Sequence, residues 1–214
     1  MTPKGRRYEK MNISELNTNL FRTINDLGKH YTYLNSPMIF IAEYMVYVLA
    51  LVVLLFWLTK NKRNRIMVIC AIITFISAEI IGKIAGKIHS NHQPFAELSK
   101  VNKLIGKAID NSFPSDHTIL FFSFCISFWL CRGGWWFLWS ILACIVGVSR
   151  IWVGVHYPAD VLVGAFISVL SAIITHAVIP KLKFTHKLLD IYDRGERLIL
   201  SPLSKFKSTR SKNL

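Results

Sequence analysis

Residues 149–160 read SRIWVGVHYPAD and separate two long apolar runs of the chain. This stretch contains an arginine, a histidine and an aspartate, namely Arg150, His156 and Asp160. A guanidinium binds phosphate oxygens through paired N–H groups, and an imidazole oriented by a carboxylate can act as a nucleophile or a base. Pro158 suits the first turn of a helix, which places Asp160 near a helix N-terminus, within reach of His156. The stretch therefore predicts a reactive turn between two helices.

The apolar runs around this turn indicate a membrane protein. Of the 214 residues, 52% are hydrophobic, and the mean hydropathy is +0.39. A helix needs about 20 apolar residues to cross a bilayer. We expect spans over residues 38–58, 66–88, 115–131, 135–152 and 159–179. The third and fourth are short, so a re-entrant pair is the alternative. The predicted fold class is an all-α integral membrane protein, a bundle of five transmembrane helices with six as the alternative.

The segment before the first span has the pattern of a surface helix. Asn12 with Glu15 three residues later resembles a capping box, and apolar residues then recur at helical spacing. We expect an amphipathic interfacial helix over residues 12–29. A sixth span here is disfavoured because Arg22, Asn25 and Asp26 would have to cross with it. The chain is expected to form one domain, residues 1–214, with a transmembrane core at about 38–180 and a basic tail at 181–214.

The distribution of charge predicts the orientation in the membrane. The formal net charge is +14, from 26 Lys and Arg against 12 Asp and Glu. Basic residues gather between the first two spans, at Arg132 and in the tail, which five spans would place on one side. The positive-inside rule assigns that side to the cytoplasm, although residues 1–10 are also basic. The charge therefore favours membrane lipids as partners over nucleic acid.

A second polar cluster is Pro114-Ser115-Asp116-His117. A helix should begin near Ser115, which is a natural N-cap, and free N–H groups at a helix start favour an anion. His117 in the first turn would face the same anion. The alternative is that Ser115 and Asp116 only cap the helix. With five spans, this cluster, the loop at 89–111 and residues 150–160 all lie on the side opposite the basic clusters.

These motifs resemble those of a known family. Ser149-Arg150, five residues, His156, three residues and Asp160 match the third signature of the type 2 phosphatidic acid phosphatase superfamily, and residues 114–117 resemble its second, Pro-Ser-Gly-His. The Phe-Pro-Ser-Asp-His form is similar to the bacitracin-resistance branch, the undecaprenyl diphosphatases. The similarity extends over roughly residues 15–195. It implies that His156 attacks phosphorus, Asp160 orients it, His117 protonates the leaving oxygen, and Arg150 and Ser115 hold phosphate oxygens.

The first signature departs from the family pattern of a lysine, six residues and Arg-Pro. Here Gln93 precedes the proline, so a phosphate-binding charge becomes a neutral donor. We expect Lys87 to supply the missing cation, with Lys83 as the second candidate. Asp116 replaces the family's glycine beside the phosphate, and the alternative is that it faces away and pairs with one of these lysines. No metal or other cofactor is expected, and the cysteines, all in apolar runs, predict free thiols.

The implied activity is hydrolysis of undecaprenyl diphosphate to the monophosphate and phosphate, through a phosphohistidine, at the outer face of the bacterial plasma membrane. This reaction would recycle the carrier lipid of cell-wall synthesis and confer bacitracin resistance. Two alternatives stay open. One is another lipid phosphatase of the superfamily, acting on phosphatidylglycerol phosphate or phosphatidic acid. The other is a non-catalytic protein that binds polyprenyl phosphate, for which the loss of arginine at Gln93 is the support.

Overall fold

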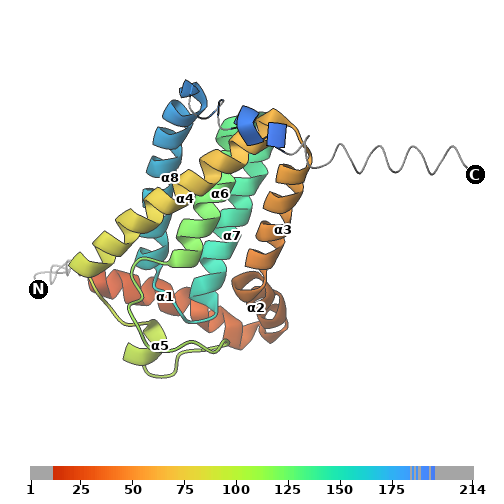
Figure 1. The fold of residues 1–214 in the computed structure, drawn as a ribbon. Coiled ribbons are helices and arrows are strands. Elements are labelled where there is room, and N and C mark those ends of the chain that lie inside the picture. The colour runs from red at the N-terminus through yellow and green to blue at the C-terminus, as the bar shows by residue number, and fades with distance from the viewer. Residues whose placement is uncertain (1–11, 184, 186, 188, 193, 196–214) are drawn as a thin grey trace, which may run out of the picture.

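The computed structural model describes residues 12–183, 185, 187, 189–192 and 194–195. Within these residues the regular structure is entirely helical (Figure 1). The α-helices are α1 (Ile13–His30), α2 (Asn35–Glu43), α3 (Met45–Leu58), α4 (Lys62–Ile88), α5 (Pro94–Glu97), α6 (Asp116–Arg132), α7 (Leu138–Trp152) and α8 (Pro158–Val178). Short 3₁₀ turns lie at Thr32–Leu34, Gly134–Phe137 and Ile179–Lys181.

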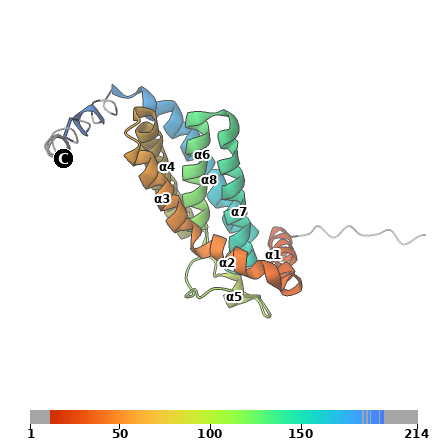
Figure 2. The ribbon, with the colours of Figure 1, turned by 90° about the vertical axis from the view of Figure 1, so that its right-hand side faces the viewer.

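The core of the molecule is a bundle in which α6 lies among α3, α4, α7 and α8 (Figures 1 and 2). Aromatic side chains of α6 fill the bundle, with Phe121, Phe124 and Phe128 all buried. Small residues let the helices approach closely, as is common in membrane bundles. A Cβ atom at Gly147 of α7 would lie 2.8 Å from the Val161 side chain of α8. Close helix packing thus fixes the position of α8 relative to α7, and the reactive turn joins these two helices.

The helices confirm the membrane class and revise the expected spans. Three segments are long and apolar enough to cross a bilayer: Lys62–Ile88, Gly134–Trp152 and Pro158–Lys181. The expected span 38–58 is not one straight helix, because the chain bends by 47° at Tyr44, between the helical segments Thr32–Glu43 and Met45–Leu58. That bent pair makes a fourth span if it crosses as a unit. Helix α6 has 17 residues and is short for a span, so the expected five spans require both α6 and the bent pair to cross.

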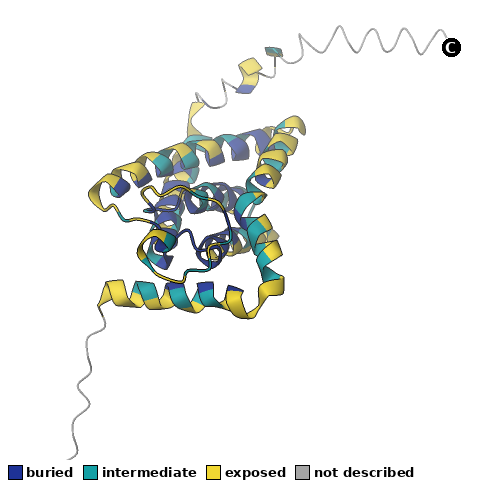
Figure 3. Cartoon of the chain, turned by 90° about the horizontal axis from the view of Figure 1, so that it is seen from below, coloured by how far each residue is buried: buried dark blue, intermediate teal, exposed yellow. Residues whose placement is uncertain are grey.

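Helix α1 lies across the end of the bundle where α2 and α5 also lie (Figures 1 and 3). The structure confirms a helix at the expected place with Asn12 as its N-cap, although the Asn12 side chain accepts from Ser14 N and not through a pair with Glu15. Its inner face buries Phe21 and Asn25. The Asn25 amide donates to the carbonyl oxygens of Asn102 and Trp152, at 3.0 and 2.8 Å. The helix is therefore docked on the loops of this end by polar contacts.

The opposite end of the bundle brings the basic segments together. Arg63 Nη2 donates to the carbonyl oxygen of Cys131 at 3.1 Å, and Arg132 Nη2 donates to Asn64 Oδ1. The first turn of α4 and the end of α6 therefore share one end, as the charge pattern predicts. The basic residues before position 12 and after position 195 lie outside the described residues.

Candidate active site

His156 lies in the tight turn between α7 and α8. Gly154 has a φ of +86°, and a Cβ atom there would lie 2.9 Å from the carbonyl oxygen of Asn102. A residue with a side chain would be strained in this conformation and crowded by the neighbouring loop. The glycine therefore lets the chain reverse within a few residues and brings His156 to a buried position, where it is 2% exposed.

The neighbours of the His156 ring determine its tautomer. Nδ1 lies 3.0 Å from the carbonyl oxygen of Ser112, 3.2 Å from Ser112 Oγ and 3.5 Å from Asp160 Oδ2. A carbonyl oxygen can only accept, so Nδ1 carries the hydrogen in the neutral imidazole and Nε2 carries the free lone pair. Burial lowers the pKa of His156 most, the charges of Arg150 and Lys107 lower it further, and Asp160 opposes them. The neutral form of the ring is thus favoured, and its Nε2 is left with a free lone pair.

Asp160 fixes this arrangement from the first turn of α8. Its Oδ2 accepts from the backbone N–H of Tyr157 at 2.8 Å and from Ser112 Oγ. Its own carbonyl oxygen accepts from Ser115 N at 3.2 Å. Gly164 one turn later approaches the carbonyl oxygen of Ser115, which a Cβ atom would meet at 3.2 Å. The two sequence motifs are therefore joined directly through Asp160 and Ser115.

The start of α6 supplies the second motif. Ser115 is the N-cap, as expected, and is fully buried, but its side chain accepts from Thr118 Oγ1 at 3.0 Å and does not cap the helix. His117 is half-buried in the first turn. The positive charges of Arg150 and Lys107 act on it, as they do on His156, so the two histidines lie near the same pair of cations. Asp116 is exposed at the first position of the helix.

Arg150 is held at the end of α7 and is 3% exposed. Its Nη1 donates to the carbonyl oxygen of Ala42 at 2.7 Å, across the bend between α2 and α3. Within the described part of the chain, Arg150 Nε is buried without a hydrogen-bond partner. A buried cation with unused N–H capacity is suited to an anionic ligand.

The Gln93 side chain was expected to donate to phosphate, but in the structure it contacts Asp110 instead. It is fully buried, its Oε1 accepts from Asp110 N at 3.1 Å, and its Nε2 donates to Asp110 Oδ1. Because both ends of the amide contact Asp110, the side chain closes the base of the loop between α5 and α6. The loop is held again at Asn111, whose Nδ2 donates to the carbonyl oxygen of Gly86 at 3.0 Å.

The lysines are also arranged differently from the expectation. Lys83 is exposed and pairs with Glu79 at 3.7 Å, and not with Asp116. Lys87 is exposed near the end of α4. The loop lysine Lys107 is half-buried, and its charge acts on both His117 and His156. Burial and the charge of Arg150 lower the pKa of Lys107, while Asp110, Asp116 and Asp160 raise it.

Two residues that contribute to the site, Ser112 and Lys107, were not singled out by the sequence. Ser112 stands two residues before the second motif, so its proximity to that motif was the available signal. Lys107 had no such signal, because only the path of the loop brings it to the histidines. The described residues contain no group of three or more His, Cys, Asp and Glu side chains able to hold a metal ion. The four cysteines are free thiols.

The buried His156 and the cations near it lie at one end of a bundle of apolar helices, an arrangement that fits a membrane-embedded phosphatase. Comparison with known proteins agrees. The model of the PAP2 superfamily matches residues 87–184. The chain belongs to this superfamily, as the motifs predicted.

Three relatives show how far the similarity extends. The bacitracin transport permease protein BcrC of Bacillus licheniformis is 54% identical over 205 residues, 95% of this chain and 100% of that protein. The undecaprenyl-diphosphatase BcrC of Bacillus subtilis is 37% identical over 157 residues, 72% of this chain and 80% of that protein. Among solved structures, Aquifex aeolicus LpxE is similar with a TM-score of 0.55 and 26% identity, over 75% of this chain and 94% of that one.

Proposed function

We propose that this protein hydrolyses undecaprenyl diphosphate to undecaprenyl phosphate and inorganic phosphate. The observation that carries the proposal is the buried His156, whose Nδ1–H bonds to the Ser112 carbonyl and whose Nε2 is left as a nucleophile beside two cations. The substrate is inferred from the relatives, because a relative named undecaprenyl-diphosphatase is 37% identical over most of both chains. Turnover of this lipid would counteract bacitracin and return the carrier lipid to cell-wall synthesis.

The reaction begins with His156. Its Nε2 attacks the terminal phosphorus, the bond from phosphorus to the bridging oxygen breaks, and the lipid monophosphate leaves with both bonding electrons. Asp160 lies 3.5 Å from Nδ1 and stabilises the positive charge that develops on the ring, as the carboxylate does in hydrolase triads. Water then attacks the phosphohistidine, the N–P bond breaks, and phosphate is released.

The cations stabilise the charge that spreads over the equatorial oxygens in the transition state. Arg150 is buried, and its Nε has no hydrogen-bond partner among the described residues. The charge of Lys107 acts on both histidines from the loop. We assign to Lys107 the part that the family's first signature gives to residues before the proline. Lys87 and Lys83, which are exposed on α4, are the second candidates for this phosphate-binding cation. Gln93 supports the loop that carries Lys107. Ser115 belongs to the second motif and donates through its backbone N–H to the carbonyl oxygen of Asp160, which supports a place for it at the phosphate site. Asp116 stays exposed at its edge.

His117 protonates the bridging oxygen as it leaves. It lies half-buried in the first turn of α6, one residue after Asp116. A phosphomonoester leaving group is much less basic than an alkoxide, so it needs less help from an acid. His117 therefore contributes less with a diphosphate than with a lipid monophosphate.

The site faces the extracytoplasmic side in this proposal. The basic residues around Arg63 and Arg132 lie at the opposite end of the bundle, and the positive-inside rule assigns such an end to the cytoplasm. The active site would then bind the diphosphate of lipids in the outer leaflet. The single-domain organisation, with α1 at the interface and the basic tail in the cytoplasm, follows from the same orientation.

The test is phosphate release by detergent-purified protein, with EDTA present, for the wild type and for His156→Ala. We expect release from undecaprenyl diphosphate by the wild type and none above background by the variant. Phosphatidylglycerol phosphate and phosphatidic acid, assayed in parallel, measure the preference among lipid phosphates. Binding of undecaprenyl diphosphate without turnover by the wild type would contradict the proposal and favour a binding protein.

A further inference from the structure

Helix α1 lies along the turn between α7 and α8, which carries His156, and runs in the opposite direction. Three residues of α1, each four positions from the next, face this turn from one side of the helix. The three contacts are Asn17 with Ala159, Phe21 with Tyr157, and Asn25 with Trp152. They follow each other in reverse order along the turn, from the start of α8 back to the end of α7. Helix α1 therefore spans the whole of the turn that carries the nucleophile.

The two outer contacts are hydrogen bonds from side-chain amides to the backbone. Asn17 Oδ1 accepts from the backbone N–H of Ala159, in the first turn of α8, at 3.0 Å. Asn25 Nδ2 donates to the carbonyl oxygen of Trp152, the last residue of α7, at 2.8 Å. The two amides therefore hold the backbone at both ends of the turn.

The middle contact holds the residue that directly follows the nucleophile. The ring centroids of Phe21 and Tyr157 lie 5.5 Å apart, and both side chains are buried. The backbone N–H of Tyr157 donates to Asp160 Oδ2 at 2.8 Å. A displacement of Tyr157 would therefore move both His156 and the carboxylate that orients it.

Asn25 also connects the turn to the loop between α5 and α6. Its Nδ2 donates to the carbonyl oxygen of Asn102 at 3.0 Å, and its Oδ1 accepts from the backbone N–H of Asn102 at 2.9 Å. The side chain is fully buried, where the loss of these partners would be costly. The same loop carries Lys107 five residues later. One side chain therefore contacts both the turn of the nucleophile and the loop of the cation.

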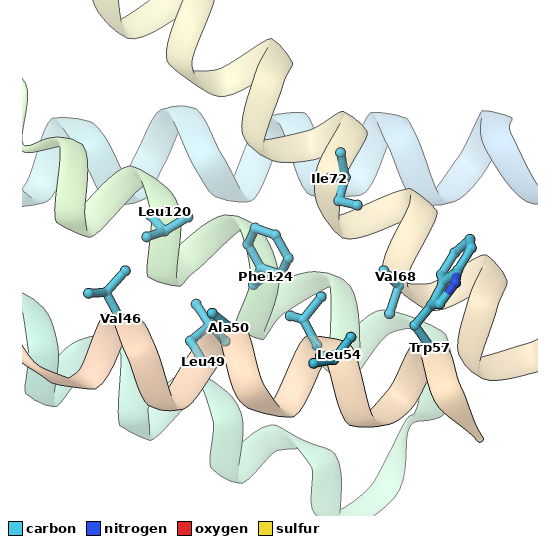
Figure 4. A pocket seen from close by; sticks show the side chains of 10 residues that line it. Val46, Leu49, Ala50, Leu54, Trp57, Val68, Ile72, Leu120 and Phe124 are labelled. Carbon is cyan, nitrogen blue, oxygen red and sulfur yellow. The ribbon is translucent and has the colours of Figure 1, made fainter.

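These polar contacts differ from the contacts inside the bundle. Between α3, α4 and α6 the side chains that line a pocket are apolar, among them Leu54, Ile72 and Phe124 (Figure 4). Apolar contacts are non-directional, whereas a hydrogen bond weakens steeply as its angle departs from linear. The amides of α1 are therefore suited to fix the direction of the backbone in the turn.

We propose that Asn17 and Asn25 are positioning residues, which act on the reaction through the turn that carries His156. They hold this turn so that Nε2 of His156 points at the terminal phosphorus. This inference rests on the proposed function, whose nucleophile it concerns. A displacement of about 1 Å in the reacting atoms can cost about 10²-fold in rate. A loss of either hold on the turn should therefore lower kcat and leave KM for the lipid nearly unchanged.

Matched variants of three asparagines of α1 test the inference. Asn17→Leu removes the acceptor for the Ala159 N–H with little change in size. Asn17→Asp restores an acceptor at the N-terminus of α8, where a negative charge is favoured. Asn25→Asp keeps an acceptor for the loop and removes the N–H groups that donate to Trp152 and to the loop. Asn19→Leu is the control, because Asn19 is exposed and lies two residues from Asn17, on the opposite side of the helix.

The values of kcat and KM for undecaprenyl diphosphate are measured for all variants in the same mixed micelles. We expect kcat to fall by about tenfold or more in Asn17→Leu and Asn25→Asp, with KM changed by less than about twofold. Asn17→Asp and Asn19→Leu should stay near the wild type. An equal loss of kcat in Asn17→Asp and Asn17→Leu, or wild-type kcat in Asn17→Leu, would overturn the inference. The Asn17 pair decides on its own if Asn25→Asp does not fold.

Hydrogen exchange of the same variants gives a readout that does not depend on turnover. Peptides that cover residues 150–162 should exchange faster in Asn17→Leu and Asn25→Asp than in the wild type. Peptides from the basic end of the bundle, at residues 125–132, should exchange at the wild-type rate. Faster exchange in both regions would indicate a general loss of stability and overturn the positioning role. If the variants show the expected pattern but the wild-type protein releases no phosphate, only the proposed function is contradicted.

Discussion

The two sides of the active site are held in different ways. The nucleophile side is a closed set of contacts, in which His156, Ser112 and Asp160 are all buried and bonded to one another. The cation side is more open, because Arg150 is anchored by one backbone contact and Lys107 is carried by a loop. Nucleophilic attack needs a defined atom in a defined direction, whereas charge stabilisation acts over longer distances. A cation can therefore be carried by a loop such as that of Lys107, whereas the histidine needs the rigid turn between α7 and α8.

The largest expected effect concerns the second histidine. His117→Ala should lower kcat on a lipid monophosphate by about 10²–10⁴-fold, comparable with His156→Ala on that substrate. On undecaprenyl diphosphate the loss should be clearly smaller, because the leaving phosphomonoester needs less protonation. Phosphate release on the two substrates measures the ratio. Equal losses on both would contradict the role of His117 as the acid for the leaving oxygen.

The cation side is tested by a matched pair of lysines. Lys107→Met should lower kcat by about 10²-fold, the order found when one group that stabilises transition-state charge is removed. Lys87→Met removes the same charge from an exposed position near the end of α4 and should have a much smaller effect. Steady-state kinetics on undecaprenyl diphosphate compare the two. A larger loss of kcat for Lys87→Met than for Lys107→Met would indicate that the cation comes from α4 and not from the loop.

The nucleophile side is tested at Ser112. Ser112→Ala removes the hydroxyl that donates to Asp160 Oδ2 and leaves the backbone carbonyl that holds the His156 ring. We expect kcat to fall by about tenfold, since an unsatisfied buried partner costs about 1–3 kcal/mol. Ser123→Ala is the control, because the Ser123 hydroxyl is buried in α6 and has no hydrogen-bond partner among the residues that the structure describes. If both variants kept wild-type kcat, the hydroxyl of Ser112 would have no part in orienting the site.

The smallest expected effect is a shift in the pH dependence of kcat/KM, which would show that the cation side of the site acts on the nucleophile side. Neutral His156 is the reactive form, so activity falls as pH drops through its pKa. Burial and the nearby cations lower that pKa, so the acid limb of kcat/KM should lie below the ordinary value of about 6.5. Removing a positive charge in Lys107→Met should move the limb to higher pH. A limb that stays in place would mean that Lys107 does not act on the nucleophile.

The sequence predicted those parts of the molecule whose geometry is local. The turn from Arg150 to Asp160 and the start of α6 at Ser115 follow from spacing, proline position and helix capping, and the structure places them as expected. The break at Tyr44 could not be read in the same way, because no proline or glycine stands near it within residues 38–58. Its position depends on the packing of α2 against α7 at the site end.

The path of the loop between α5 and α6 could not be predicted from local sequence patterns for a different reason. Gln93 and Asp110 are 17 residues apart and contact each other through both ends of the amide, and nothing in either position marks the other as its partner. The same closure brings Lys107 to the histidines. Asn25 is comparable, since a polar residue that argued against a membrane span is buried by its bonds to Asn102 and Trp152. Contacts over such separations are set by the tertiary fold.

The central claim is that Nε2 of His156 forms the bond to phosphorus, and trapping the phosphoenzyme tests it most directly. Undecaprenyl diphosphate labelled in its terminal phosphate is mixed with the wild-type protein, and the reaction is stopped with alkali during turnover. The account predicts acid-labile label on His156, attached at Nε2 because Nδ1 is held by the Ser112 carbonyl, and no label in His156→Ala. Label on another residue or on Nδ1, or continued turnover by His156→Ala, would contradict it.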